Sequence, residues 1–180
     1  GHEGCTHTQL VTRAVFNRES RHIATSGAEG IVKVWTVEEC EPILSIEVDN
    51  IKPKRVSSVA FNSDGRFVIT GDWGSHVKVF DVKQGKCVMK FEQAHTGKVT
   101  SVAFKKDNKL LLSGGEDYTC RLYDPRAKGG SGGAFHAFRA PDEVLDVQFA
   151  PDGHGVIGAL RSKELWCWDQ RKGDEPVVKY

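Results

Sequence analysis

Residues 99–127 read VTSVAFKKDNKLLLSGGEDYTCRLYDPRA, and this stretch decides the fold. Its first segment, VTSVAF, alternates apolar and polar residues as a half-buried β-strand does. Asp107-Asn108 supplies a tight turn. We therefore expect three strands, named a, b and c, over residues 99–104, 109–114 and 118–123, and a fourth, strand d, after a loop. No long segment of the chain shows a helical stripe of apolar residues.

The same unit occurs four times. One aromatic position recurs at spacings of 45, 43 and 45 residues, and a second, 19 residues later, recurs at the same spacings. The first series is Phe16, Phe61, Phe104 and Phe149, and the second is Trp35, Phe80, Tyr123 and Trp168. Strand d is clearest in PILSIEV (42–48), CVMKFE (87–92) and EPVVKY (175–180). Repeated four-stranded units of this length predict an all-β fold of propeller blades.

The expected blade boundaries follow from the repeats, and the whole of residues 1–180 is one partial propeller. Blade 1 covers about 7–50, blade 2 about 51–93, blade 3 about 94–139 and blade 4 about 140–180. The first aromatic series, together with Trp35 and Trp168, is expected in the core.

Composition narrows the class of function. The 180 residues carry a formal net charge of +1, which does not favour a nucleic-acid binder, and no apolar run is long enough to span a bilayer. The five cysteines are too widely spaced for a metal site and odd in number, which indicates reduced thiols in an intracellular protein, cytoplasmic or nuclear. The opening GHEGC has no Met, which indicates a processed form or a piece of a longer protein.

The chain resembles the WD-repeat β-propellers over all 180 residues. The family's Trp-Asp dipeptide appears as Trp168-Asp169, Tyr123-Asp124 and Phe80-Asp81, while blade 1 has Trp35-Thr36. The resemblance implies a hydrogen-bonded tetrad in each blade, made by a His before strand a, a Ser or Thr on strand b, an Asp in the b–c turn and the strand-c aromatic. Blade 3 matches with His95, Ser113, Asp117 and Tyr123, and blade 1 offers His7, Thr25, Glu29 and Trp35.

The other two blades depart from the tetrad. Blade 2 has Lys52, Thr70, Gly74 and Phe80, with its Asp displaced to Asp72, and blade 4 has Ala140, Gly158, Ser162 and Trp168. The family usually closes with seven blades, so four are expected to form an incomplete ring. The missing neighbours would be blades from the rest of the native chain, from a second chain or from a second copy.

The residue types of the tetrad also occur in hydrolases. His95, Ser113 and Asp117 resemble a catalytic triad on paper, but a triad needs an exposed Ser beside an oxyanion hole. We favour the structural interpretation, with burial of Ser113 as the discriminator. No motif indicates a nucleotide, a metal or another cofactor.

Two groups of residues are candidates for partner binding. On the face with the b–c turns, Trp73, Lys54, Arg55 and Arg161 are expected to receive a protein or peptide, acidic or phosphorylated. The alternative is that Trp73 folds back onto its loop and the basic residues are merely solvated. Arg126 and Arg171 complete two WDxR patterns, which resemble the docking box of cullin–RING ubiquitin-ligase substrate receptors. The alternative is that each Arg pairs locally with the preceding Asp.

The sequence therefore predicts a non-catalytic scaffold or adaptor that presents propeller loops to partner proteins. A ubiquitin-ligase substrate receptor is the alternative. A signalling subunit similar to G-protein β is a lesser alternative, because TCRLYDPRA (119–127) resembles one of its blades. Membrane binding and nucleic-acid binding are not expected.

Overall fold

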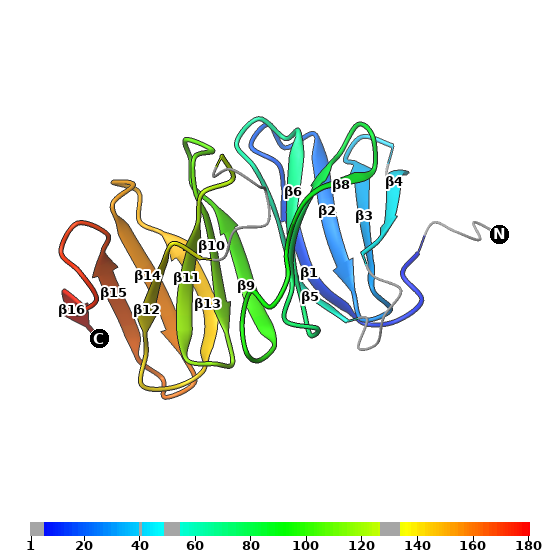
Figure 1. The fold of residues 1–180 in the computed structure, drawn as a ribbon. Coiled ribbons are helices and arrows are strands. Elements are labelled where there is room, and N and C mark those ends of the chain that lie inside the picture. Colours follow the sequence, from blue (N-terminus) through cyan, green and yellow to red (C-terminus); the bar gives the residue numbers. More distant parts are fainter. Residues whose placement is uncertain (1–5, 40, 49–54, 127–133) are drawn as a thin grey trace.

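The protein folds into four sheets, each of four antiparallel strands (Figure 1). The computed structural model describes residues 6–39, 41–48, 55–126 and 134–180. Each sheet is one blade, with strands in chain order, so the predicted all-β blade architecture is confirmed. Blade 1 holds β1 (Val11–Phe16), β2 (His22–Gly27), β3 (Ile31–Thr36) and β4 (Pro42–Glu47); blade 2 holds β5 (Val56–Phe61), β6 (Phe67–Asp72), β7 (Val77–Asp81) and β8 (Lys86–Phe91). Blade 3 holds β9 (Val99–Phe104), β10 (Leu111–Gly115), β11 (Thr119–Tyr123) and β12 (His136–Arg139); blade 4 holds β13 (Val144–Phe149), β14 (Gly155–Leu160), β15 (Leu165–Asp169) and β16 (Val178–Lys179).

The core lies between the blades rather than inside them. Three buried apolar clusters join blade 1 to blade 2, blade 2 to blade 3 and blade 3 to blade 4. Each cluster combines apolar residues of one blade with the strand-c aromatic of the next, namely Phe80, Tyr123 and Trp168. Period-2 alternation thus gives every inner blade two apolar faces, one for each neighbour.

A hydroxyl group on strand a connects each blade to the next. The side chain donates a hydrogen bond to the backbone carbonyl at the start of the following strand a, at 2.6 Å in the first junction and 2.5 Å in the third. The three pairs are Thr12 to Val56, Ser57 to Val99 and Thr100 to Val144. At the equivalent position blade 4 has Leu145, which is 49% exposed.

The ring is open between blades 1 and 4. The two blades lie at opposite ends of the row in Figure 1, and none of the three clusters contains residues of both. Across the channel, the Arg13 guanidinium lies 3.6 Å from the Asp146 carboxylate, which also accepts a hydrogen bond from Ser101. The described residues include no helix that is long and apolar enough to cross a membrane.

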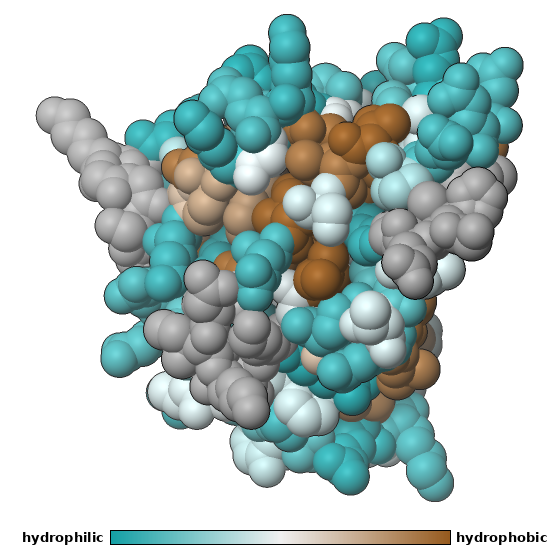
Figure 2. Space-filling view, turned by 90° about the vertical axis from the view of Figure 1, so that its right-hand side faces the viewer, coloured by the Kyte–Doolittle hydropathy of each residue, from teal (hydrophilic) through white to brown (hydrophobic). Residues whose placement is uncertain are grey.

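The outer flank of blade 1 carries an apolar surface, visible as the brown area in Figure 2. Leu10, Val11, Phe16 and Ile43 are each between 46% and 63% exposed. The prediction that Phe16 belongs to the core is wrong. The equivalent residues of blades 2 to 4 pack against the preceding blade, and Phe16 has no preceding blade among the described residues.

Candidate functional site

The loops of the propeller form two opposite faces, and backbone hydrogen bonds fix which loops share a face. In every blade, the residue before the turn-Asp position donates its N–H to the loop that leads into strand a: Ala28 to Leu10, Trp73 to Arg55, Glu116 to Lys98 and Arg161 to Glu143. We call this side the b–c face. The a–b turns and the c–d loops form the opposite side, the a–b face, where Gln170 N donates to His154 O.

Trp73 lies on the b–c face in contact with two cations. The Arg55 guanidinium is 4.5 Å from the centre of its ring, and the Lys98 ammonium of the next blade is 4.3 Å away. Lys98 also makes a 2.9 Å ion pair with Glu116. The indole is half-buried, so it is neither fully exposed nor folded away from solvent. Cation–π contacts of this kind hold the indole in place while leaving part of its surface accessible.

The other predicted residues of this face have different surroundings. Lys54 lies outside the described residues. Arg161 makes a 2.7 Å ion pair with Glu143. That hydrogen bond, with contributions from nearby Asp142 and Glu116, raises the pKa of Arg161. Because Arg161 is surrounded by carboxylates, it is less suited to receive an acidic group than the cations around Trp73.

The tetrad residues of blade 3 are brought together. His95 Nδ1 lies 2.8 Å from Asp117 Oδ1, and His95 Nε2 lies 2.6 Å from Ser113 Oγ. The Tyr123 hydroxyl lies 3.2 Å from Ser113 Oγ and donates to the Ala94 carbonyl at 3.0 Å. The phenol thus extends the network to the loop before strand a, whereas an indole would end it at the Ser.

Electrostatics agree with a neutral histidine beside an ionised carboxylate. Burial lowers the pKa of His95 and outweighs the opposing hydrogen bond and charge of Asp117. Burial opposes ionisation of Asp117, but hydrogen bonds from His95, Thr119 and the Thr96 N–H hold its pKa well below the usual range. Burial also raises the pKa of Tyr123 to about 12. The network therefore holds one charge, on Asp117, at neutral pH.

Blade 1 forms the same network with different atoms. His7 Nδ1 contacts Glu29 at 2.5 Å, His7 Nε2 contacts Thr25 Oγ1 at 2.7 Å, and Trp35 Nε1 donates to the same Thr25 oxygen at 2.8 Å. At the tetrad positions of blades 2 and 4, Thr70 Oγ1 and Trp168 Nε1 are buried and have no hydrogen-bond partner among the described residues.

The triad-like geometry of blade 3 is not accessible to a substrate. Ser113 has no exposed surface and His95 is 1% exposed. A nucleophilic Ser needs an approach path and an oxyanion hole beside it. His95, Ser113 and Asp117 therefore act as a structural network. In the described part of the chain, no group of three or more His, Cys, Asp or Glu residues could hold a metal ion.

The two WDxR arginines lie on the a–b face, each held by the Asp of its own motif. Arg126 donates to Asp124 at 2.9 and 2.8 Å, and Arg171 donates to Asp169 at 2.9 and 2.7 Å. The hydrogen bonds from Arg126 lower the pKa of Asp124 to about 2. The side chains of Arg126 and Arg171 are 62% and 59% exposed. Each Arg is therefore oriented by local pairing and remains open to a partner.

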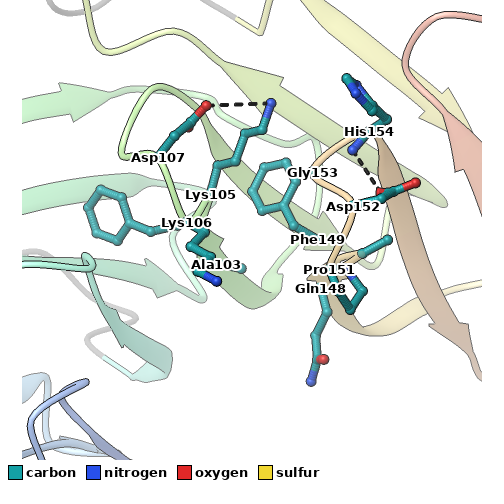
Figure 3. A pocket seen from close by; sticks show the side chains of 12 residues that line it. Ala103, Lys105, Lys106, Asp107, Gln148, Phe149, Pro151, Asp152, Gly153 and His154 are labelled. Atoms are coloured by element: carbon teal, nitrogen blue, oxygen red, sulfur yellow. Dashed lines mark hydrogen bonds and ion pairs between the residues drawn. The ribbon is translucent and has the colours of Figure 1, made fainter.

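A cavity of about 620 Å³ opens on the same face, between the a–b turns of blades 3 and 4 (Figure 3). Phe149 lies between the two turns, and the turns supply Lys105 and Asp107 on one side and Asp152 on the other. Lys105 and Asp107 are 3.8 Å apart. The rim holds both lysine and aspartate side chains, so its charge favours neither an anion nor a cation.

Sequence reasoning missed several residues that the structure brings to the b–c face. Lys98 was not among the residues expected to contact Trp73, and Tyr118, Arg121 and Arg139 were not among the expected site residues. The sequence did offer a signal for Lys98, because it lies just before strand a of blade 3, as Arg55 lies just before strand a of blade 2.

Comparison with known proteins supports the resemblance. The family model "WD domain, G-beta repeat" matches residues 2–36, 48–81 and 85–124. The fourth sheet lies outside the matched residues.

Curated relatives span much longer chains. Periodic tryptophan protein 2 of Arabidopsis thaliana is 29% identical over 170 residues, which are 92% of this chain and 18% of the relative. Serine-threonine kinase receptor-associated protein of Gallus gallus is 26% identical over 157 residues, 87% of this chain and 41% of the relative. The mRNA export factor of Danio rerio is 29% identical over 103 residues, 55% of this chain and 28% of the relative. The chain thus spans less than half the length of these relatives. Together with the four four-stranded blades, the family match shows that this chain belongs to the WD-repeat family.

Proposed function

We propose that the protein is a non-catalytic interaction platform whose b–c face binds partner proteins or peptides. The observation that carries this proposal is the stack of Arg55, Trp73 and Lys98. An aromatic ring fixed by contact with cations offers a partner apolar area without a large loss of side-chain freedom on binding. The tetrads of blades 1 and 3 support it by holding the loops of this face on rigid sheets.

The free thiols support a place inside the cell. Cys120 is buried and free, and Cys87 and Cys167 are also free. Burial raises the pKa of the Cys120 thiol. A protein with such thiols is suited to the reducing cytoplasm or nucleus.

The test is affinity purification with quantitative mass spectrometry, comparing the wild type with Trp73→Ala and with Arg18→Ala. Arg18 is an exposed residue of the blade 1 a–b turn and serves as a matched surface control. We expect Trp73→Ala to lose at least one partner that both other proteins retain, with circular dichroism unchanged. If all three proteins retain the same partners, the b–c face is not the binding face.

A second candidate is docking to the propeller adaptor of a cullin–RING ubiquitin ligase through the a–b face. The observation that favours it is the pair of oriented, exposed guanidinium groups of Arg126 and Arg171. An oriented guanidinium suits an acidic group of a partner. Recovery of adaptor and cullin with the wild type, and their loss with the double variant Arg126→Ala, Arg171→Ala, would support it. Their absence from the wild-type sample would count against it.

We also propose that further propeller blades cover the apolar flanks of blades 1 and 4. Phe16 is 61% exposed at a position where the equivalent residues pack on a neighbouring blade. Leu145 and Leu165 are exposed on blade 4. The blades would come from the rest of the native chain, a second chain or a second copy. Sedimentation of this 180-residue chain tests the last of these sources, because only a second copy makes the chain a dimer.

A further inference from the structure

A polar cavity of about 290 Å³ lies at the outer edge of the b–c face of blade 3. Its walls include Thr96, Tyr118, Arg121 and Arg139, together with Asp117 of the tetrad. The cavity is distinct from the Trp73 stack, because none of its lining residues belongs to that stack.

The internal repeats show why this corner differs from its equivalents. Strand c carries a cation at the same position in three blades: Lys33, Lys78 and Arg121. The residue two positions before this cation on strand c pairs with a residue of strand d. That strand-d residue is Glu47 in blade 1 and Arg139 in blade 3, and extension of the register makes it Glu92 in blade 2. Blade 3 thus replaces a carboxylate beside the cation by a second cation.

The one acid in the cavity wall is already fully engaged. Asp117 Oδ1 accepts from His95 and Thr119, and Asp117 Oδ2 accepts from the Thr96 N–H and from Arg121 Nη2 at 3.0 Å. Arg121 Nε donates to Thr119, and Nη1 makes no hydrogen bond to any of the described residues. In the described part of the chain, the Arg139 guanidinium makes no hydrogen bond or ion pair. Two guanidiniums against one saturated carboxylate leave the cavity with an excess of one positive charge.

The turn that forms the rim holds an aromatic in a strained conformation. Tyr118 has φ of +64° and is 48% exposed. The equivalent turn residues are Gly30, Ser75 and Lys163, all with positive φ, so the turn itself requires this conformation. A bulky aromatic is an unfavourable choice there on backbone grounds. The turn conformation therefore does not explain the choice of Tyr118, whereas its position on the rim of a basic cavity allows it to contact a bound ligand.

We infer that this cavity binds one oxyanion, a phosphate or a carboxylate, carried by a side chain of a partner peptide, with Arg121 and Arg139 as the ligating groups. Paired guanidiniums match the geometry and charge of such groups. The inference refines the proposed binding function by giving the b–c face a second, chemically defined contact.

The test is titration of the isotope-labelled protein with inorganic phosphate, followed by the arginine Nε–H signals in NMR spectra at constant ionic strength. We expect saturable shifts confined to Arg121, Arg139 and their neighbours. Arg139→Glu restores the residue type of blades 1 and 2, so it should fold normally, and it should weaken binding at least tenfold. Arg18→Glu makes the same charge change far from the cavity and should bind like the wild type.

Three pentapeptides that differ only in a central phosphoserine, glutamate or serine then identify the anion. Tighter binding of the phosphoserine or the glutamate peptide assigns phosphate or carboxylate. The inference is overturned if neither peptide binds better than the serine peptide, or if Arg139→Glu and Arg18→Glu behave alike. The titration needs no native partner, so it can fail while the Trp73→Ala purification succeeds, and the reverse.

Discussion

Replacing Asp117 by Ala removes the carboxylate that joins the b–c turn of blade 3 to the loop before β9. It accepts four hydrogen bonds, from His95, Thr119, Arg121 and the Thr96 N–H. We expect the variant to fold and to lose a large part of its stability.

The magnitude follows from what each former partner can do in the variant. The buried His95 ring is left without an acceptor, which costs about 1–3 kcal/mol, and loss of the Thr119 bond costs about 1 kcal/mol. Arg121 and the Thr96 N–H reach solvent, so together they contribute less than about 1 kcal/mol. The expected loss in the free energy of unfolding is therefore about 3 kcal/mol. For a chain of this size it lowers the Tm by roughly 6–12 °C, at about 2–4 °C per kcal/mol.

The assay is thermal and urea unfolding followed by circular dichroism at pH 7, with Asp107→Ala as the control. Asp107 is an exposed carboxylate of the same blade that pairs weakly with Lys105 and accepts a hydrogen bond from the Lys109 N–H of its turn. The control should lose less than about 1 kcal/mol, because both interactions lie at the surface. An Asp117→Ala protein that melts with the control would refute the view that the network stabilises the blade.

Three further outcomes are expected. Burial lowers the pKa of His95 in the folded chain, whereas in the unfolded chain the histidine keeps its ordinary pKa of about 6.5. Below pH 6.5 the unfolded chain therefore binds a proton at His95 that the folded chain does not bind. The free energy of unfolding should therefore fall as pH decreases below 6.5, by up to about 1.4 kcal/mol per pH unit, and His95→Asn should reduce this slope in urea titrations. Gly158→Ala should destabilise by about 1–3 kcal/mol in calorimetry, because a Cβ there would lie 3.1 Å from the Trp168 ring. Phe104→Ala should cost about 3 kcal/mol in the same measurement, whereas Phe16→Ala should cost less than about 1 kcal/mol because that side chain is 61% exposed.

The repeats made most of the fold predictable. The expected strand over residues 99–104 coincides with β9, since alternation marks it along its whole length. The strand expected over 109–114 begins two residues later, at Leu111, because the a–b turn extends through Leu110. Phe16 was misplaced because a residue at this position is buried only against a preceding blade, which no local pattern reveals.

The candidate sites were less predictable than the sheets. The tetrad of blade 3 could be named from the resemblance to WD-repeat propellers, because each member lies at the position that the family's pattern gives it. The Trp73 stack depends on Lys98 of the next blade, and the basic cavity depends on which strand-d residue faces strand c. Both are contacts between segments whose pairing is set by register and packing rather than by sequence distance.

The hydrogen bond from the strand-a hydroxyl to the next blade has a consequence for the duplication of repeats. Each link uses one Ser or Thr side chain and a backbone carbonyl, and a backbone carbonyl is present whatever residue follows. A duplicated unit of about 44 residues therefore arrives with its own connector and needs no matching substitution in its neighbour. Blade 4 carries Leu145 at the equivalent position, and an apolar side chain there cannot donate this hydrogen bond.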